Sequence, residues 1–381
     1  MTVWEAVAAL LMLGAGAGLL YLAAAIVLVR RLARGQAGSS LTTPSITLLK
    51  PLHGAEPRLF EHLSTFLAQD YAGPVQIIFG VQNQRDPAIE IVRELERAFP
   101  AADIELVIDT RLHGTNRKVS NLINMVERAR HEIVVLADSD MIVGPGYLGG
   151  LISELTRPGV GAVTCLYHGV PLGSVWSRLS ALGIDSHFLP SVAVGIGLGL
   201  AKPCFGSTIA LRRDTLNAIG GFHALADDLA DDYLLGAAVR DLGLRVAVTS
   251  FTIGHACNER SVGDLLRQEL RWVRTIRQLD AVGHAGSVVS HPLPLALFAF
   301  CLNPGPAAAS AVAAAILLRM ALCLAVKQAF GLRGQVYGLS PVRDLLSFGI
   351  FVASFFGRGV SWRGHSYDVT PAGVLTAKTR H

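Results

Sequence analysis

The stretch IVVLADSDMIV, residues 133–143, decides how the chain folds. Its first part, Ile133–Ala137, is an uninterrupted apolar run of the length that a fully buried strand has. The run ends on Asp138 and Asp140, whose side chains point the same way in an extended segment because alternate residues share a face. Two carboxylates at the carboxyl end of a buried strand can hold a hard divalent cation and the phosphates that it bridges. The alternative is a polar strand end that enters a turn.

Strand and helix signals alternate through the first half of residues 45–285. This alternation predicts an α/β domain with a mostly parallel sheet and helices on both faces. We expect strands at 45–50, 75–82, 104–109 and 133–137, and helices at 57–68, 87–99 and 117–129. Ligands bind outside the carboxyl ends of the strands in such sheets. Those ends carry the polar residues Lys50, Gln82, Asn83, Asp86, Asp138 and Asp140.

The second half of this region is less regular. We expect strands at 160–166, 208–212 and 246–248, and helices at 214–219, 230–242 and 261–279, of which the last is basic and amphipathic. Residues 189–200 form an apolar, glycine-rich run that is too short to cross a bilayer. This run can lie at a membrane interface, line a pocket for an acceptor substrate or form a buried loop.

The chain is more apolar than a soluble enzyme. Of its 381 residues, 51% are hydrophobic and 16% are charged, whereas about 25% are charged in ordinary globular domains. Residues 3–29 are apolar apart from Glu5 and long enough to span about 30 Å of hydrocarbon. They exceed the apolar run of a signal peptide and lack a basic start, so we expect a retained anchor. Arg30, Arg31 and Arg34 follow it and place the next domain in the cytoplasm by the positive-inside rule.

A second apolar zone lies near the C-terminus, with runs at 288–302, 307–326 and 345–356. The sequence Pro304-Gly305-Pro306 separates the first two runs, as a tight turn between helices would. The third run is short and predicts a re-entrant or interfacial segment. Counting the N-terminal anchor, three spans keep the basic tail in the cytoplasm, whereas four would place it outside against the charge rule. The tail residues in question are Arg358, Arg363 and His365.

Cysteine usage and charge exclude several classes of protein. The five cysteines are odd in number and form no CxxC pair, which argues against a disulfide framework or a structural zinc site and fits a reducing compartment. A net charge of +4 suits an anionic membrane surface better than nucleic acid. The sequence also lacks nucleic-acid-binding, GxGxxG, Walker A and GxSxG motifs.

Several motifs together resemble a known family. They are LLKPLHGAEP (48–57), VQNQRDPAIE (81–90), NRKVSNLINM (116–125), ADSD (137–140), LADDY (229–233) and QELRW (268–272). In this order and spacing they resemble membrane-anchored family-2-like glycosyltransferases, and most of all the ceramide glucosyltransferase-like family in its bacterial, hopanoid-associated branch. The resemblance covers about residues 44–300, the N-terminal anchor and VSWRGHSYDV (360–369).

The resemblance implies a domain organisation. We expect a transmembrane anchor at 1–34, a cytoplasmic GT-A-like domain at 44–285, membrane helices at 286–356 and a tail at 357–381. The GT-A-like sheet would be mostly parallel and flanked by helices, with transmembrane helices at both ends of the chain. The lipid bilayer is therefore a partner, and nucleic acid is not.

The resemblance also implies a site for a UDP-sugar donor. Asp86 would contact the uridine, and Lys118 would border the donor. Asp138 would face the ribose, and Asp138 and Asp140 would hold Mg²⁺ or Mn²⁺ against the charge that builds on departing UDP. The chain departs from many relatives at Asn83, where aspartate is common. A helix cap before Pro87 would also explain Asp86, and a solvated helix start would explain Lys118.

The third aspartate of the family pattern corresponds to Asp232, which the resemblance makes the general base. An alcohol must lose its proton as it attacks the anomeric carbon, so the reaction needs such a group. Asp227, Asp228 and Asp231 lie nearby, and like charges raise some of the pKa values within such a cluster. The alternative is a set of acids favoured by the dipole of a helix N-terminus.

The QELRW motif completes the family pattern. The resemblance implies that Gln268 and Arg271 touch the diphosphate and that Trp272 frames the acceptor. His187 matches a family position near the acceptor. The alternative for the motif is an amphipathic helix on the membrane surface, with its arginines on lipid phosphates and Trp272 as an interface anchor.

The resemblance therefore implies an inverting, metal-assisted glycosyltransferase of the bacterial inner (plasma) membrane, multi-pass with its catalytic domain in the cytoplasm. It would move one sugar from UDP-GlcNAc or UDP-glucose to a hydroxyl of a membrane lipid acceptor. A hopanoid polyol is the expected acceptor, and ceramide is the alternative. A processive polysaccharide synthase would need more membrane helices. From another class, a nucleotide-binding scaffold or transporter remains, although the intact motif set argues against it.

Overall fold

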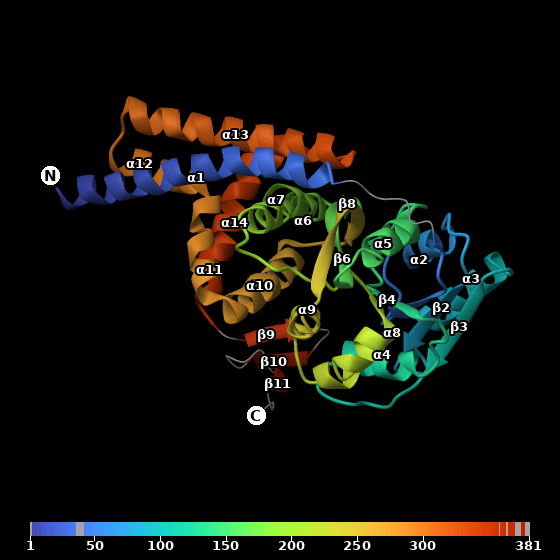
Figure 1. The fold of residues 1–381 in the computed structure, drawn as a ribbon. Helices are drawn as coiled ribbons and strands as arrows, with labels where there is room; N and C mark the ends of the chain where they lie inside the picture. The colour runs from blue at the N-terminus through green and yellow to red at the C-terminus, as the bar shows by residue number, and fades with distance from the viewer. Residues whose placement is uncertain (1, 36–41, 358, 363–364, 370–374, 378–381) are drawn as a thin grey trace.

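The computed structural model describes residues 2–35, 42–357, 359–362, 365–369 and 375–377. Its main part is an α/β domain around an eight-stranded sheet of order β3-β2-β1-β4-β7-β6-β8-β5 (Figure 1). The strands are β1 (Ile46–Pro51), β2 (Val75–Val81), β3 (Asp103–Ile108), β4 (Ile133–Ala137), β5 (Met141–Ile142), β6 (Val160–Pro171), β7 (Thr208–Arg212) and β8 (Arg245–Cys257).

The pairing of the strands places most of their carboxyl ends at one edge. β1 pairs in parallel with β2 and β4, and β8 pairs in parallel with β6. β7 is antiparallel between β4 and β6, and the short β5 is antiparallel to β8. The predicted mostly parallel sheet is thus confirmed. The amino end of the reversed strand β7 consequently lies beside the carboxyl end of β4 and the middle of β6.

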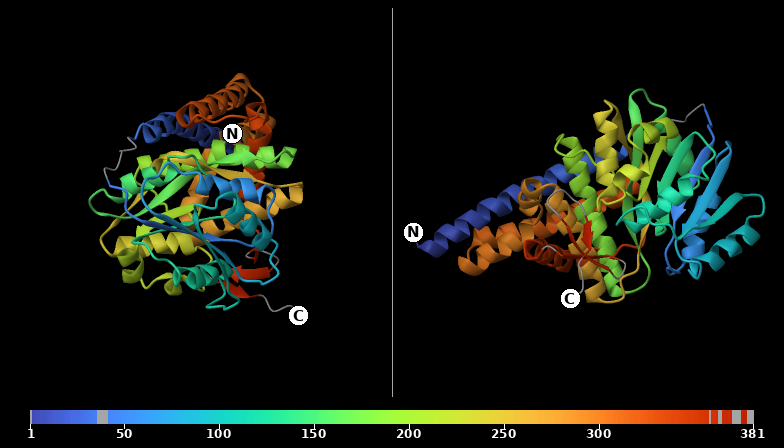
Figure 2. Two further views of the ribbon diagram at one scale, coloured as in Figure 1. Left: turned by 90° about the vertical axis from the view of Figure 1, so that its right-hand side faces the viewer. Right: turned by 90° about the horizontal axis from the view of Figure 1, so that it is seen from below.

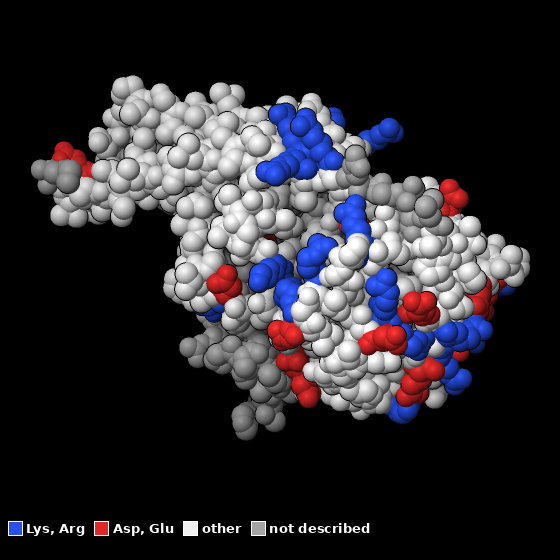
Figure 3. All heavy atoms as spheres, in the orientation of Figure 1, with Lys and Arg blue, Asp and Glu red and all other residues white. Residues whose placement is uncertain are grey.

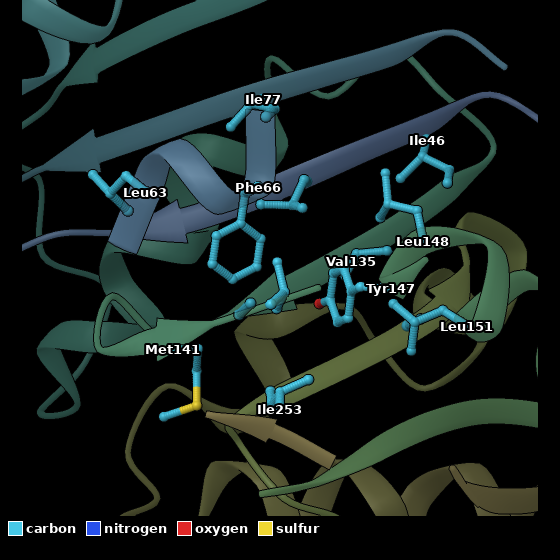
Figure 4. Packing of buried hydrophobic residues seen from close by; sticks show 14 of the residues in the cluster. Ile46, Leu63, Phe66, Ile77, Val135, Met141, Tyr147, Leu148, Leu151 and Ile253 are labelled. Atoms are coloured by element: carbon cyan, nitrogen blue, oxygen red, sulfur yellow. The ribbon is translucent and has the colours of Figure 1, made fainter. Parts of the chain in front are cut away.

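Helices cover both faces of the sheet. One face packs against α2 (Leu59–Leu67), α3 (Ala88–Ala98) and α5 (Tyr147–Leu155). Figure 4 shows this layer, in which the ring of Phe66 meets the ring of Tyr147 edge-on at 5.6 Å. The other face packs against α4 (Arg117–Val126), α8 (Arg213–Ala218), η2 (Phe222–Leu225) and α9 (Asp231–Asp241).

Most expected elements form, and two strands are longer than expected. β1, β2, β4 and β7 lie within about one residue of their predicted bounds because each is a short apolar run between turn residues. β6 and β8 continue past their apolar starts to Pro171 and Cys257. Their pairing has register shifts, which interrupt the alternation of apolar and polar residues that marks a strand in sequence.

Apolar helices form a second body beside the α/β domain. Three helices are long and apolar enough to cross a membrane, namely Val3–Ala33 (α1), Val175–Gly197 and Pro306–Phe330 (α13). The bent pair Ala281–Ser290 and Pro292–Leu302 would be a broken span or a re-entrant loop, with a bend of 66°. Figure 2 shows α1 and α13 projecting away from the sheet. Basic side chains gather where α1 meets the α/β domain (Figure 3), and Arg30 and Arg31 occupy the last turn of this helix.

The segment Val175–Gly197 was not expected to be one helix. It consists of α6 (Val175–Gly183), a π-helical turn η1 (Ile184–Phe188) and α7 (Leu189–Gly197), and most of it is buried inside the protein. The expected run at 189–200 is therefore the end of a packed helix. Serine residues and Asp185 interrupt the apolar pattern that would have revealed the whole helix.

The expected run at 288–302 begins with a bend because its helix α12 (Pro292–Leu302) starts on prolines that lack backbone donors. It follows α11 (Ala281–Gly286) and η3 (Ser287–Ser290).

The run at 345–356 belongs to α14 (Ser340–Ser354), preceded by η4 (Tyr337–Leu339). A small sheet follows, with β9 (Gly359–Trp362), β10 (His365–Val369) and β11 (Leu375–Ala377). The expectation based on Arg358 and Arg363 falls outside the described residues.

Buried ion pairs tie the apolar helices to the α/β domain. α10 (Val262–Leu279) carries Glu269, whose carboxylate accepts two hydrogen bonds from Arg343 of α14, at 2.7 and 2.5 Å. Both side chains are buried. The next residue, Asp344, accepts from Arg319 of α13 at 2.9 Å. α14 therefore fixes the orientation of α10 relative to the apolar helices.

We predict that Arg343→Met lowers the free energy of unfolding by about 3–5 kcal/mol, because it leaves the Glu269 carboxylate buried without its cation. Thermal unfolding of the purified protein in detergent measures the loss. The double variant Glu269→Leu with Arg343→Met should recover most of it, since no unpaired charge remains.

The matched control is Arg93→Met, which breaks an exposed ion pair with Glu90 and should change stability by less than about 1 kcal/mol. Equal effects of Arg343→Met and Arg93→Met would contradict this account of the buried pair.

Candidate active site

Polar residues from strands far apart in sequence meet at the common edge of the sheet. β1 ends beside Lys50, and β4 ends at Asp138 and Asp140. Ala137 is paired with Thr208 at the amino end of β7, which brings Gly206 next to Asp138. The edge of the sheet therefore collects the charged groups that sequence analysis singled out.

Lys118 lies at the centre of an acidic cluster. Its Nζ is 2.7 Å from Oδ1 of Asp138 and 3.7 Å from Oδ2 of Asp231. Burial opposes the charge on Lys118, but these carboxylates outweigh burial and raise the pKa of the lysine above its ordinary value. The cation stays charged and links β4 to the start of α9. Asn116, the N-cap of α4, fixes the same contact by donating to the backbone oxygen of Asp228.

Asp232 is oriented by backbone donors. Its Oδ2 accepts from Gly206 N and its Oδ1 from Tyr233 N, both at 2.8 Å. Burial raises the pKa of Asp232 above its ordinary value, and Lys118 opposes that shift. Burial likewise raises the pKa of Asp231 to about 6. A fixed carboxylate with a raised pKa is suited to accept a proton from a hydroxyl group.

Gly206 marks the point where three functional groups converge. A methyl group at this position would lie 3.1 Å from Lys118 Nζ, 3.4 Å from Asp232 Oδ2 and 3.6 Å from Asp138 Oδ2. The backbone of the loop can approach these groups closely because glycine has no side chain. Asp138, Asp232 and Lys118 therefore form one site, as the sequence pattern predicted.

Asp140 is held by His255 from β8. Met141 is paired with His255 across β5 and β8, and the histidine Nε2 lies 3.4 Å from Asp140 Oδ2. Burial alone would raise the pKa of Asp140, but His255 outweighs burial and lowers it to about 2. The other oxygen, Oδ1, is buried and has no hydrogen-bond partner in the described structure.

The described side chains do not form a complete metal site, so a divalent cation would need further coordinating atoms from a bound substrate or from water. Among the described residues, no group of three or more His, Cys, Asp and Glu side chains is arranged to hold a metal ion. The carboxylate of Asp138 is one-third exposed, and Asp140 has the unpartnered oxygen Oδ1. Two carboxylates suit Mg²⁺ or Mn²⁺ when phosphate oxygens and water supply the remaining ligands.

Lys50 stabilises the turn after β4 that carries Asp138 and Asp140. It is fully buried, lies over the ring of Phe66 and donates to the backbone oxygen of Asp138. Burial lowers the pKa of Lys50 to about 7, although Asp138 and Asp140 oppose that shift. The lysine thus fixes the backbone that carries both aspartates.

Asp86 is buried and accepts hydrogen bonds from backbone groups on two elements. Its carboxylate accepts from Gly54 N at 3.0 Å and from Ala88 N at 2.9 Å, so it joins the loop after β1 to the start of α3. The capping interpretation of Asp86 thus describes a real contact. Its contact with a nucleoside stays a prediction.

The QELRW helix reaches the same edge of the sheet. Gln268 and Asp140 line one cavity of about 200 Å³. The ring of Trp272 meets the ring of His255 edge-on at 5.8 Å, and Arg271 precedes it on the helix. The motif therefore packs against the α/β domain, and its alternative role on the membrane surface stays a prediction. The roles of Gln268, Arg271 and Trp272 toward substrates stay predictions.

His187 lies apart from the acidic cluster. Its Nε2 is 2.9 Å from Asp344 Oδ1, and its ring stacks on His291 at 5.6 Å. The neighbouring residue Phe188 stacks on Tyr167 of β6 at 4.5 Å. The structure thus directs His187 toward the apolar helices, and its contact with an acceptor stays a prediction.

His255 and Gly206 are the residues that sequence reasoning missed. No spacing in the chain links His255 to Asp140, because only the pairing of β5 with β8 brings them together. Gly206 lies 26 residues before Asp232 in the chain, and its backbone N–H donates to that carboxylate. A lone histidine near the end of a strand at the functional edge was the available signal.

Comparisons with known proteins agree with this geometry. The family model of "Glycosyl transferase family 21" matches residues 10–375. Ceramide glucosyltransferase 1 of Caenorhabditis elegans is 22% identical over 234 residues, which are 61% of this chain and 50% of that protein. The ceramide glucosyltransferase of Gibberella zeae is 27% identical over 141 residues, 34% of this chain and 27% of that protein. The chain thus spans about half or less of the length of these relatives.

A solved structure shares the fold. The mannosyltransferase PcManGT from Pyrobaculum calidifontis, in complex with GDP-Man and Mn²⁺, superimposes with a TM-score of 0.55 at 21% identity. The match covers 93% of this chain and 99% of that one. The α/β domain is therefore GT-A-like, with apolar helices at both ends of the chain as candidate spans.

We predict that Lys118→Met lowers the free energy of unfolding by roughly 2–3 kcal/mol, because it leaves Asp138 and Asp231 without their shared cation. The value is below that of a fully buried pair because water screens the exposed part of Asp138. Thermal unfolding in detergent measures it. The exposed Lys202→Met is the control, and an equally small loss in both variants would contradict the central role of Lys118.

Proposed function

The chain belongs to glycosyl transferase family 21, and we propose that it transfers one sugar from a UDP-sugar to a hydroxyl group of a membrane lipid. One observation carries this proposal. Asp138, Asp232 and Lys118 converge on Gly206, beside a helix, α10, that is locked by ion pairing to α14 next to the apolar helices. A donor site for a soluble nucleotide-sugar and an acceptor site for a lipid would thus lie together.

Asp232 would act as the general base. Its two backbone hydrogen bonds fix the carboxylate, and its raised pKa suits proton transfer. The acceptor oxygen forms a bond to the anomeric carbon as its proton passes to Asp232. The bond from that carbon to the diphosphate oxygen breaks, and the electron pair leaves with UDP. A direct displacement of this kind inverts the configuration of the sugar.

Asp138 and Asp140 would hold Mg²⁺ or Mn²⁺. The unpartnered Oδ1 of Asp140 and the partly exposed carboxylate of Asp138 fit such an ion. When bound, the cation neutralises charge on the diphosphate of the leaving group. The presence of Mn²⁺ and GDP-Man in the Pyrobaculum calidifontis structure supports this assignment.

The remaining predicted residues would bind the two substrates. Lys118, Gln268 and Arg271 would border the diphosphate, and Asp86 would reach the uridine through its position between the loop after β1 and α3. Trp272 would frame the acceptor, together with the aromatic rings around His255. His187 contacts Asp344 among the apolar helices, so it would reach a lipid acceptor only from that side of the protein.

The acceptor is proposed to be a hopanoid polyol, with UDP-GlcNAc or UDP-glucose as donor. The motifs of the bacterial branch support a hopanoid, whereas the ceramide glucosyltransferases of Caenorhabditis elegans and Gibberella zeae favour ceramide as the second candidate. The basic residues in the last turn of α1 support a catalytic domain on the cytoplasmic side of a bacterial inner membrane. A non-catalytic scaffold or transporter would not require a base oriented like Asp232.

We predict that Asp232→Asn lowers turnover by about 10²- to 10⁴-fold, which is the contribution of a positioned general base, while the affinity for UDP stays unchanged. UDP release by purified protein with metal and lipid measures turnover, and calorimetry measures UDP binding. The exposed Asp227→Asn in the same loop is the control and should keep turnover. Undiminished turnover in Asp232→Asn would remove the base assignment, and binding of UDP without any turnover would favour the scaffold.

We predict that EDTA stops UDP release and that added Mn²⁺ or Mg²⁺ restores it. Asp140→Asn should raise the metal concentration for half-maximal turnover at least about tenfold, because it weakens the oxygen ligand that has no other partner. Full activity in EDTA would contradict a role for the cation. Mass spectrometry of lipids from cells with and without the protein identifies the acceptor and the sugar.

A further inference from the structure

A cavity beside Asp140 is lined by two residues of the proposed site, Asp140 and Gln268, and by others that the mechanism described above does not use. It has a volume of about 200 Å³ and lies between the loop after β1 and α10. The residues that line it are Glu56, Pro57, His62, Asp140, Leu172, Ala256, Asn258, Glu259, Asp264 and Gln268. It adjoins the proposed metal position through Asp140 and the QELRW helix through Gln268.

The charge of the cavity disfavours a free phosphate group as its occupant. Glu56, Glu259 and Asp264 line it together with Asp140, and its lining includes no lysine or arginine. An acidic, partly enclosed wall repels a free phosphate. The same carboxylate oxygens are strong acceptors for hydroxyl donors.

Two buried side chains in the lining have polar atoms without partners. Glu259 is 4% exposed, and its Oε1 accepts from Ser180 Oγ at 2.9 Å while its Oε2 has no partner. His62 is also 4% exposed, and its Nδ1 has no partner. Buried polar atoms in proteins are almost always hydrogen-bonded, so unpartnered atoms on residues that line a cavity indicate a ligand with complementary groups.

We infer that this cavity binds the adjacent hydroxyl groups of one sugar or polyol, with Glu259 and His62 as the residues that select it. The inference rests on the proposed function and names the part of the substrate that this site receives. The volume lies below the 300–1,000 Å³ typical of pockets for larger ligands, so it suits one ring or a short polyol chain and excludes a whole nucleotide-sugar. The hydroxyl groups would belong either to the hexosyl group of the donor or to the polar head of the lipid acceptor.

Glu259→Gln tests the inference. The substitution keeps the size of the side chain and an oxygen for Ser180, but replaces the free acceptor with a donor. We expect the KM for the substrate that carries the hydroxyl groups to rise about tenfold or more, as loss of a charged hydrogen bond does. Affinity for UDP alone should not change, because UDP lacks the hexosyl group and its ribose is assigned to Asp138.

The arms of the experiment distinguish the two sources of hydroxyl groups. KM is measured for UDP-glucose and UDP-GlcNAc at saturating lipid, and for bacteriohopanetetrol and ceramide in detergent micelles at saturating donor. A rise confined to the UDP-sugars assigns the cavity to the donor, and a rise confined to the lipid assigns it to the acceptor. Calorimetry with UDP-glucose and with UDP gives the same comparison without turnover.

Two further variants keep the test independent of folding. Glu154→Gln removes another buried carboxylate, in α5 away from the site, and should leave every KM unchanged. Asn258→Trp places a large ring on an exposed residue of the cavity lining and should raise the same KM as Glu259→Gln. Unchanged KM values and UDP-glucose affinity in both cavity variants, with an active wild type, would overturn this inference alone. A wild type that binds no UDP would overturn the proposed function and this inference with it.

Discussion

The site depends on charge compensation among buried carboxylates. Without nearby cations, their mutual repulsion would be strong in the low dielectric of the interior. Asp138, Asp231 and Asp232 share a small volume, and Lys118 lies between them with its charge maintained by their field. His255 of β8 likewise compensates the charge of Asp140, which lies in the turn between β4 and β5. Each cation comes from a different element of the fold, so the cluster can form only when the sheet and its flanking helices are complete. Folding and assembly of the site are therefore the same event.

The apolar helices contribute to the site through consecutive residues of α14. Arg343 pairs with Glu269 inside the QELRW motif, and Asp344 pairs with Arg319 and His187 among the apolar helices. A short segment of backbone thus carries one ion pair into the α/β domain and another into the second body. The α/β domain and the apolar helices are thus connected by buried electrostatic contacts, which tolerate little displacement because unpaired buried charges are costly.

Sequence reasoning predicted the features that short apolar runs and turn residues determine. The run Ile133–Ala137 is buried throughout and ends at the functional edge, and the three aspartate motifs lie along that edge. Features set by tertiary register could not be predicted. The meeting of His255 with Asp140 depends on strand pairing, and the direction of His187 depends on a π-helical turn that no local pattern marks. The whole helix Val175–Gly197 was hidden by polar residues whose partners come from distant segments.

The π-helical turn at Ile184–Phe188 has a consequence for the evolution of this chain. A turn of this kind contains one residue more than a regular helix needs, and in it His187 lies against Asp344 while Phe188 stacks on Tyr167. Loss of one residue here would turn α7 by about 100° relative to α6 and part the ring of Phe188 from Tyr167. Insertions and deletions should therefore be rarer in this segment than in loops of equal length, although no charged group of the acidic cluster lies within it.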